Sequence, residues 1–76
     1  MTERDRYLDC EGLLCPLPVL KARKTLTSMQ TGQILIIRTT DPMANIDLPH
    51  FCKESGNHYL QGTERNGVTT HLVRRG

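Results

Sequence analysis

Residues 15–18 read Cys15-Pro16-Leu17-Pro18, and the rest of the chain can be arranged around this stretch. Proline suits the first turn of a helix and is unfavourable further inside one, because its missing N–H needs no intrahelical partner in that turn. The stretch therefore predicts a helix start, with Cys15 at or next to the N-cap, Pro16 at the first helical position and Pro18 at the third. The positive pole of the helix dipole favours a thiolate at Cys15, to which only Leu17 could donate a backbone hydrogen bond.

The first predicted helix runs from these prolines to Thr31-Gly32, where glycine ends it. Lys21 and Lys24 fall on its outer side. Its apolar residues recur at helical spacing and predict one inward stripe. The stripe comprises Val19, Ala22, Leu26 and Met29.

A second helix is predicted from Asn45 or Asp47 to Ser55, with either residue as its cap and Pro49 in its first turn. Gly56 is expected to close it, since glycine adopts the left-handed conformation that ends many helices. Its inner side is predicted to consist of Leu48, Phe51 and Cys52.

Four strands are predicted, at residues 7–9, 34–37, 58–64 and 68–74. The second is a continuous apolar run and is expected to be central and nearly buried on both faces. Asn66-Gly67 predicts a type I′ hairpin between the last two strands. Alternation in the last strand suggests that Thr69 and His71 lie on an exposed face. The order predicts an α+β protein: a two-layer α/β sandwich, βαβαββ, whose four-stranded mixed sheet carries both helices on one face.

The totals restrict the functions that fit. Seventy-six residues make one domain, predicted to span 1–76, with a thin core and no deep pocket. A net charge of +2 gives no reason to expect a nucleic acid or a membrane as partner. Residues 1–6 have no apolar leader segment, and three cysteines leave an odd thiol. We therefore expect a cytoplasmic protein with reduced thiols, working as a monomer.

Several motifs together resemble the signature of the TusA/SirA/YedF sulfur-carrier family, and look closest to its TusA branch. The first motif comprises Leu8-Asp9, Gly12-Leu13 and the stretch from Cys15 through Pro16 and Pro18 to Val19. The second comprises Asp41-Pro42 and the run 47–52. The resemblance covers nearly the whole chain, from about Leu8 to Val73.

The resemblance implies a two-layer sandwich and a persulfide on Cys15, with no cofactor beyond that covalently held sulfur. It implies a donor, either a cysteine desulfurase or a rhodanese, and a protein that accepts the sulfur. The pathways it implies are transfer RNA thiolation, molybdenum cofactor assembly and sulfur oxidation. Such a chain would be a sulfurtransferase only in the sense of relaying a persulfide.

Two positions depart from the family pattern close to the expected thiol: Leu14 replaces a usually polar residue and Ile46 an often basic one. A third departure shifts the alignment by one residue at 56–58, so no role is transferred to His58. We expect Leu14 and Ile46 to contribute to docking. A basic collar around the thiol is a further expectation, and an acidic partner would suit it. That collar comprises Lys21, Arg23 and Lys24.

The other thiols and the histidines leave alternatives open. Cys10, at the end of the first strand, could be a second thiol that resolves Cys15 as a disulfide, which would make the chain a dithiol redox protein. Cys52 is expected to pack in the core. No metal site is predicted, because the cysteines and histidines lack ligand spacing. The remaining alternative is a regulatory or RNA- or protein-binding module in which Cys15 is merely structural.

Overall fold

The computed structural model describes residues 5–76. Residues 1–4 lie outside the described residues. They include the beginning of the predicted domain and most of the segment, residues 1–6, in which no apolar leader was expected. Two helices and four strands follow one another in the predicted βαβαββ order. They are β1 (Asp5–Cys10), α1 (Leu17–Thr27), β2 (Ile34–Thr39), α2 (Ala44–Ser55), β3 (His58–Arg65) and β4 (Val68–Arg74).

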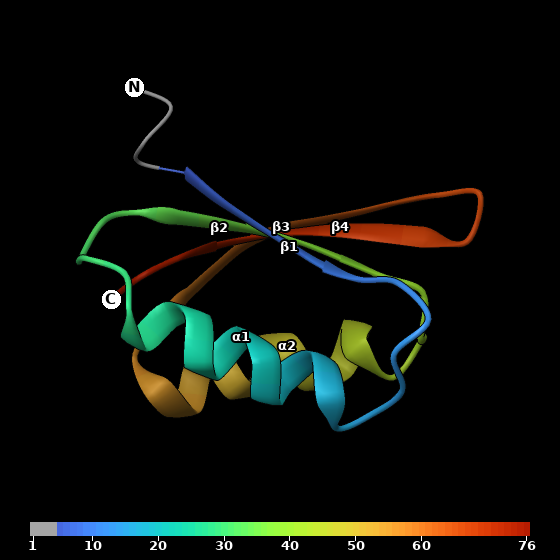
Figure 1. The fold of residues 1–76 in the computed structure, drawn as a ribbon, viewed down its shortest axis with the longest axis horizontal. Coiled ribbons are helices and arrows are strands. Elements are labelled where there is room, and N and C mark those ends of the chain that lie inside the picture. The colour runs from blue at the N-terminus through green and yellow to red at the C-terminus, as the bar shows by residue number, and fades with distance from the viewer. Residues whose placement is uncertain (1–4) are drawn as a thin grey trace.

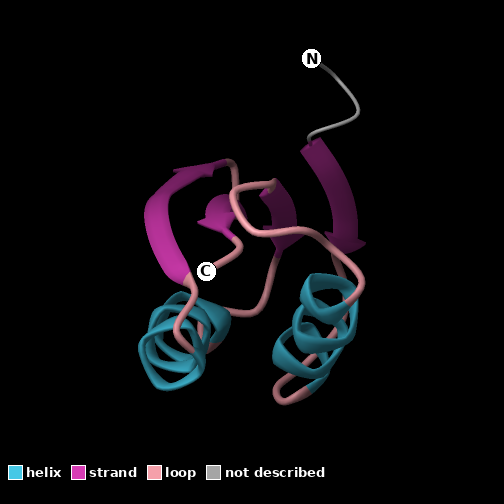
Figure 2. Cartoon of the chain, turned by 90° about the vertical axis from the view of Figure 1, so that its left-hand side faces the viewer, coloured by secondary structure: helices cyan, strands magenta, loops and turns pink. Residues whose placement is uncertain are grey.

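The strands form one mixed sheet in the order β1-β2-β4-β3. β1 pairs with β2 in parallel, whereas β4 pairs antiparallel with both β2 and β3. Both helices lie against the same face of the sheet, as Figures 1 and 2 show from two directions. The predicted two-layer sandwich is therefore confirmed.

The core lies between the sheet and the two helices. From β2, Leu35 and Ile37 point into it and are fully buried, and Ile34 and Ile36 on the open face of the sheet are half-buried. Leu48 of α2 is also fully buried. The stripe predicted for α1 is buried at Ala22, Leu26 and Met29, and Val19 is half-buried. The inner side predicted for α2 is confirmed, because Leu48, Phe51 and Cys52 all lie in the core.

The prediction that Thr69 and His71 lie on an exposed face is wrong. His71 has no exposed surface, and Thr69 is buried too. The two imidazole nitrogens have separate partners: Thr39 Oγ1 lies 2.8 Å from Nε2, and the Tyr59 hydroxyl lies 2.7 Å from Nδ1. Burial of the polar ring is acceptable because both nitrogens are hydrogen-bonded.

Because His71 is buried, its pKa is lowered from the usual value near 6.5. The unfolded chain therefore binds a proton at His71 before the folded protein does. We expect the free energy of unfolding to fall as the pH drops below about 6.5, by up to about 1.4 kcal/mol per pH unit until the lowered pKa is reached. Urea denaturation between pH 7.5 and 5 measures this slope.

The matched controls for this prediction are His71→Gln and His50→Gln, since His50 is exposed on α2. His71→Gln is expected to flatten the pH dependence in this range, whatever its effect on stability at pH 7.5. His50→Gln is expected to retain the slope. An unchanged slope in His71→Gln would contradict the assignment.

Several element boundaries differ from the prediction. α1 ends at Thr27, before the predicted Thr31-Gly32, and α2 begins at Ala44. Asp41 starts this earlier turn, because its Oδ1 accepts the Met43 N–H at 3.1 Å. Neither Asn45 nor Asp47 is therefore the cap. Pro49 lies inside the helix and not in its first turn.

The predicted turns are confirmed. Gly56 ends α2 with a φ of 80°, in the left-handed region. Asn66 and Gly67 both have positive φ, 53° and 82°, as a type I′ turn requires.

Candidate functional site: an exposed thiol beside two carboxylates

Cys15 lies in the connection from β1 to α1, two residues before the helix begins, and it is exposed. Its predicted place next to the N-cap is confirmed, and Pro16 is that N-cap. The predicted helical positions of the two prolines are wrong, because Leu17 is the first helical residue and Pro18 the second. The Leu17 N–H donates to the Leu14 carbonyl at 2.8 Å, so it does not serve the thiol.

Two hydrogen bonds hold the Cys15 loop against the loop that follows β2. The Cys15 N–H donates to Asp41 Oδ2 at 2.8 Å, and the Gly12 N–H donates to Thr40 Oγ1 at 2.8 Å. Gly12 has a φ of 81°, which a side chain would strain. These loops meet because parallel β1 and β2 end at the same edge of the sheet. The backbone at Cys15 is thus fixed by a carboxylate that is distant in sequence.

The expectation of a thiolate favoured by the helix dipole is wrong in direction. The pKa of Cys15 is raised, first by a hydrogen bond to the Asp47 side chain and then by desolvation. The negative charges of Asp47 and Asp41 add to this effect. Pro16 also places the sulfur one residue outside the N-cap, and the dipole effect falls off within the first turn. The unloaded thiol is therefore kept neutral at physiological pH.

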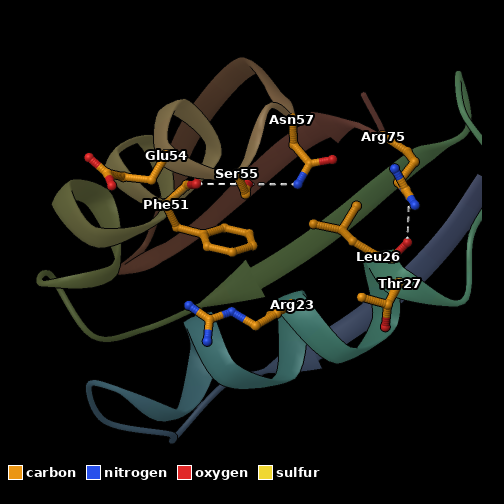
Figure 3. A pocket seen from close by; sticks show the side chains of 8 residues that line it. All are labelled: Arg23, Leu26, Thr27, Phe51, Glu54, Ser55, Asn57 and Arg75. Atoms are coloured by element: carbon orange, nitrogen blue, oxygen red, sulfur yellow. Dashed lines mark hydrogen bonds between the residues drawn. The ribbon is translucent and has the colours of Figure 1, made fainter.

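A hollow of about 420 Å³ lies beside the thiol, between α1 and α2. Its lining residues are Cys15, Pro16, Val19, Arg23, Asp47, His50, Phe51 and Glu54. A second hollow, of about 330 Å³, adjoins it and shares Arg23, Phe51 and Glu54 (Figure 3). The Arg23 guanidinium lies 5.4 Å from the centre of the Phe51 ring, a cation–π contact across the seam of the helices. Both hollows are open surface features.

The predicted docking residues are only partly brought together. Leu14 and Ile46 are 68% and 64% exposed, and each is the chain neighbour of a residue that lines the hollow. Arg23 lines the hollow itself. Lys21 and Lys24 are exposed on α1 but do not line it, so within residues 5–76 the predicted collar supplies one basic side chain to the hollow.

The motif residues beside the thiol have separate structural roles. Pro18 is buried under the start of α1, and Gly12 makes the turn described above. Sequence reasoning missed the two carboxylates, Asp41 and Asp47, as partners of Cys15. The topology contained the signal for Asp41, since loops after parallel neighbouring strands lie at one edge of the sheet.

The other two cysteines are placed differently from Cys15. Cys10 has no exposed surface and Cys52 has 1%, and all three thiols are free. Burial raises the pKa of Cys10, although Lys21 lowers it in part, and burial raises the pKa of Cys52 to about 11. Core placement of Cys52 is as predicted. Burial of Cys10 gives no support to the dithiol alternative, and exposure of Cys15 gives none to a purely structural role for it.

Two further features of the described chain bear on the class of protein. Within residues 5–76, no group of three or more histidine, cysteine or acidic side chains is placed to hold a metal ion. None of the helices described is long and apolar enough to cross a membrane.

The fold and the site together define a small two-layer α/β protein that presents a single thiol at the mouth of an open hollow. Residues 6–75 match the family model described as sulfurtransferase TusA. The chain belongs to the TusA family.

Similar proteins agree with this assignment. A protein named sulfur carrier protein TusA, from Allochromatium vinosum, is 40% identical over 75 residues, which cover 99% of both chains. A putative sulfur carrier protein from Neisseria meningitidis serogroup A is 43% identical over 67 residues, covering 88% of this chain and 90% of that one. The crystal structure of a SirA-like protein from Desulfitobacterium hafniense superposes with a TM-score of 0.76 at 25% identity, covering 92% of this chain and 96% of that one.

Proposed function

We propose that the protein is a sulfur carrier in which Cys15 holds sulfane sulfur as a persulfide. The observation that carries the proposal is that Cys15 alone of the three cysteines is exposed, on a backbone fixed by Asp41. The names of the similar proteins support the same role. Transfer between thiols needs an accessible sulfur and a clear approach, and both are present.

Loading moves one sulfur atom without net oxidation. The Cys15 sulfur attacks the outer sulfur of a donor persulfide, a new S–S bond forms on Cys15, and the donor S–S bond breaks. The donor leaves as a thiolate and takes up a proton, while the Cys15 thiol gives up one. Delivery repeats the exchange with an acceptor thiol as the attacking group. The donor would be a cysteine desulfurase or a rhodanese, and the acceptor another protein, in transfer RNA thiolation or a related pathway.

Docking of these partners would use the surface around the thiol. Leu14 and Ile46 offer exposed apolar contacts on either side of Cys15, and Arg23 offers a positive charge in the hollow. Lys21 and Lys24, which do not line the hollow, would contact a partner only outside it. The two hollows between the helices are open, which suits a protein that relays sulfur between larger partners, with no cofactor besides the bound sulfur. We further propose that it acts in the cytoplasm as a monomer, without contacting nucleic acid or a membrane.

The test is a loading experiment on the intact protein. A cysteine desulfurase supplied with cysteine is expected to add one sulfur atom, observed by intact mass spectrometry. The addition should be removed by a thiol reductant, since a persulfide S–S bond is exchangeable. An unchanged mass with both a desulfurase and a rhodanese as donor would contradict the proposal.

A further inference from the structure

We propose that Asp47 is a positioning residue that holds the unloaded Cys15 sulfur as a neutral thiol and so limits its reaction with electrophiles. The inference rests on the proposed function, because it assigns a control over the loading step. In this resting state the Cys15 thiol is accessible but reacts slowly, until the negative charge of Asp47 is neutralised by a partner or Asp47 is displaced.

The geometry places Asp47 where such control is exerted. Cys15 comes from the β1–α1 connection and Asp47 from the first turn of α2, yet both line the same hollow. Asp41 draws the two segments together, because one carboxylate oxygen accepts the Cys15 N–H and the other the Met43 N–H at the start of α2. The Asp47 N–H donates to the Met43 carbonyl at 2.8 Å, so the same start of α2 brings Asp47 to the hollow that Cys15 lines.

The charged and titratable groups around Cys15 come from every element that borders the hollow. They are Arg23 from α1, Asp41 from the β2–α2 connection, and Asp47, His50 and Glu54 from α2. A hydrogen bond to Asp47 is the largest cause of the raised Cys15 pKa, whereas Asp41 acts only through its charge. Each Asp41 carboxylate oxygen already accepts a backbone N–H. Asp47 is therefore the carboxylate available to accept a hydrogen bond from the thiol.

The consequence for loading follows from the reactive form of cysteine. The thiolate is the attacking species, so a thiol beside a carboxylate must lose its proton against that negative charge before the donor S–S bond can be attacked. In the unloaded carrier this arrangement slows the reaction of Cys15 with small electrophiles and oxidants. A donor protein that covers the hollow and neutralises Asp47 would lift the restraint at the moment of transfer.

The experiment measures the alkylation rate of Cys15 by neutral iodoacetamide against pH, in the isolated protein. Asp47→Asn is expected to shift the rate profile to lower pH and to speed alkylation at pH 7 several-fold. Asp47→Glu is expected to restore the slow reaction at least in part. Glu54→Gln, which changes a carboxylate of the same hollow that does not act on the thiol, should leave the profile unchanged. Circular dichroism checks that each variant is folded.

Two results would overturn the inference: an Asp47→Asn profile that matches the wild type, or an equal acceleration in Glu54→Gln. Since alkylation needs no sulfur donor, these outcomes are independent of the loading experiment. A shifted profile without sulfur loading would retain the role of Asp47 and reject the carrier. Loading with an unshifted profile would retain the carrier and reject the role of Asp47.

Discussion

Cys15→Ser is expected to abolish sulfur loading completely, with no added mass after incubation with a desulfurase and cysteine. The physical reason is that a hydroxyl cannot form the persulfide, and the two remaining thiols are buried in the core with raised pKa values. Stability should change little, since surface substitutions are usually within about 0.5 kcal/mol of neutral. The loss therefore measures chemistry and not folding.

The matched controls are Cys10→Ala and Cys52→Ala, which remove the buried thiols one at a time. Both are expected to retain one added sulfur per chain, even if the cavities they create lower the melting temperature. Loss of loading in a folded Cys10→Ala variant would favour the dithiol alternative. Loading that survives in Cys15→Ser would place the sulfur elsewhere and refute the assignment.

Leu48→Ala is expected to cost about 2–5 kcal/mol in the free energy of unfolding. Leu48 is fully buried and attaches α2 to the sheet, so its removal leaves a cavity in the single layer of core. A chain of this size has a free energy of unfolding of roughly 4–11 kcal/mol, so the substitution would remove a large part of it. Denaturation in urea, followed by circular dichroism, measures the loss.

Ile46→Ala is the matched control for this prediction, because Ile46 lies two residues earlier on the same helix and is 64% exposed. It is expected to change stability by less than about 0.5 kcal/mol. If Ile46→Ala cost as much as Leu48→Ala, the inner and outer faces of α2 would be assigned wrongly. Ile46→Ala also leaves Cys15 intact, so any loss of loading in this variant would report on docking.

The element order could be predicted because local signals agreed with the final topology. Gly56 and Asn66-Gly67 require positive φ, and the structure has it at each of them. The failures arose where two local signals competed. Asp41-Pro42 is a typical turn signal after the second strand, but Asp41 also starts α2, where the Ala44 N–H donates to the Asp41 carbonyl at 3.0 Å. Pro49 is consequently inside the helix.

The burial of His71 could not be derived from its own strand, because both faces of β4 mix polar and apolar residues. Pairing with β2 decides the face: His71 lies opposite Ile37, whose side chain points into the core. Gly62 gave a weak indication that His71 has a close partner. It pairs with His71, and its missing side chain leaves room for the Tyr59 hydroxyl. A glycine inside a strand often marks such a close approach.

At the functional site, the position of Cys15 could be predicted from the sequence, and the pKa of its thiol could not. The helix-start signal correctly placed Cys15 near the beginning of α1, because proline geometry is local. The pKa of its thiol depends on Asp41 and Asp47, which are 26 and more residues away along the chain. No local pattern around Cys15 contains that information, and the dipole argument alone predicts the wrong direction.

The most direct measurement is to map the added sulfur on the wild-type protein with all three cysteines present. The desulfurase-loaded chain is alkylated, digested and sequenced by mass spectrometry. The account predicts that the extra sulfur is found on the peptide containing Cys15, and that the Cys10 and Cys52 peptides carry none. Sulfur on either buried cysteine, or on no cysteine at all, would contradict the account.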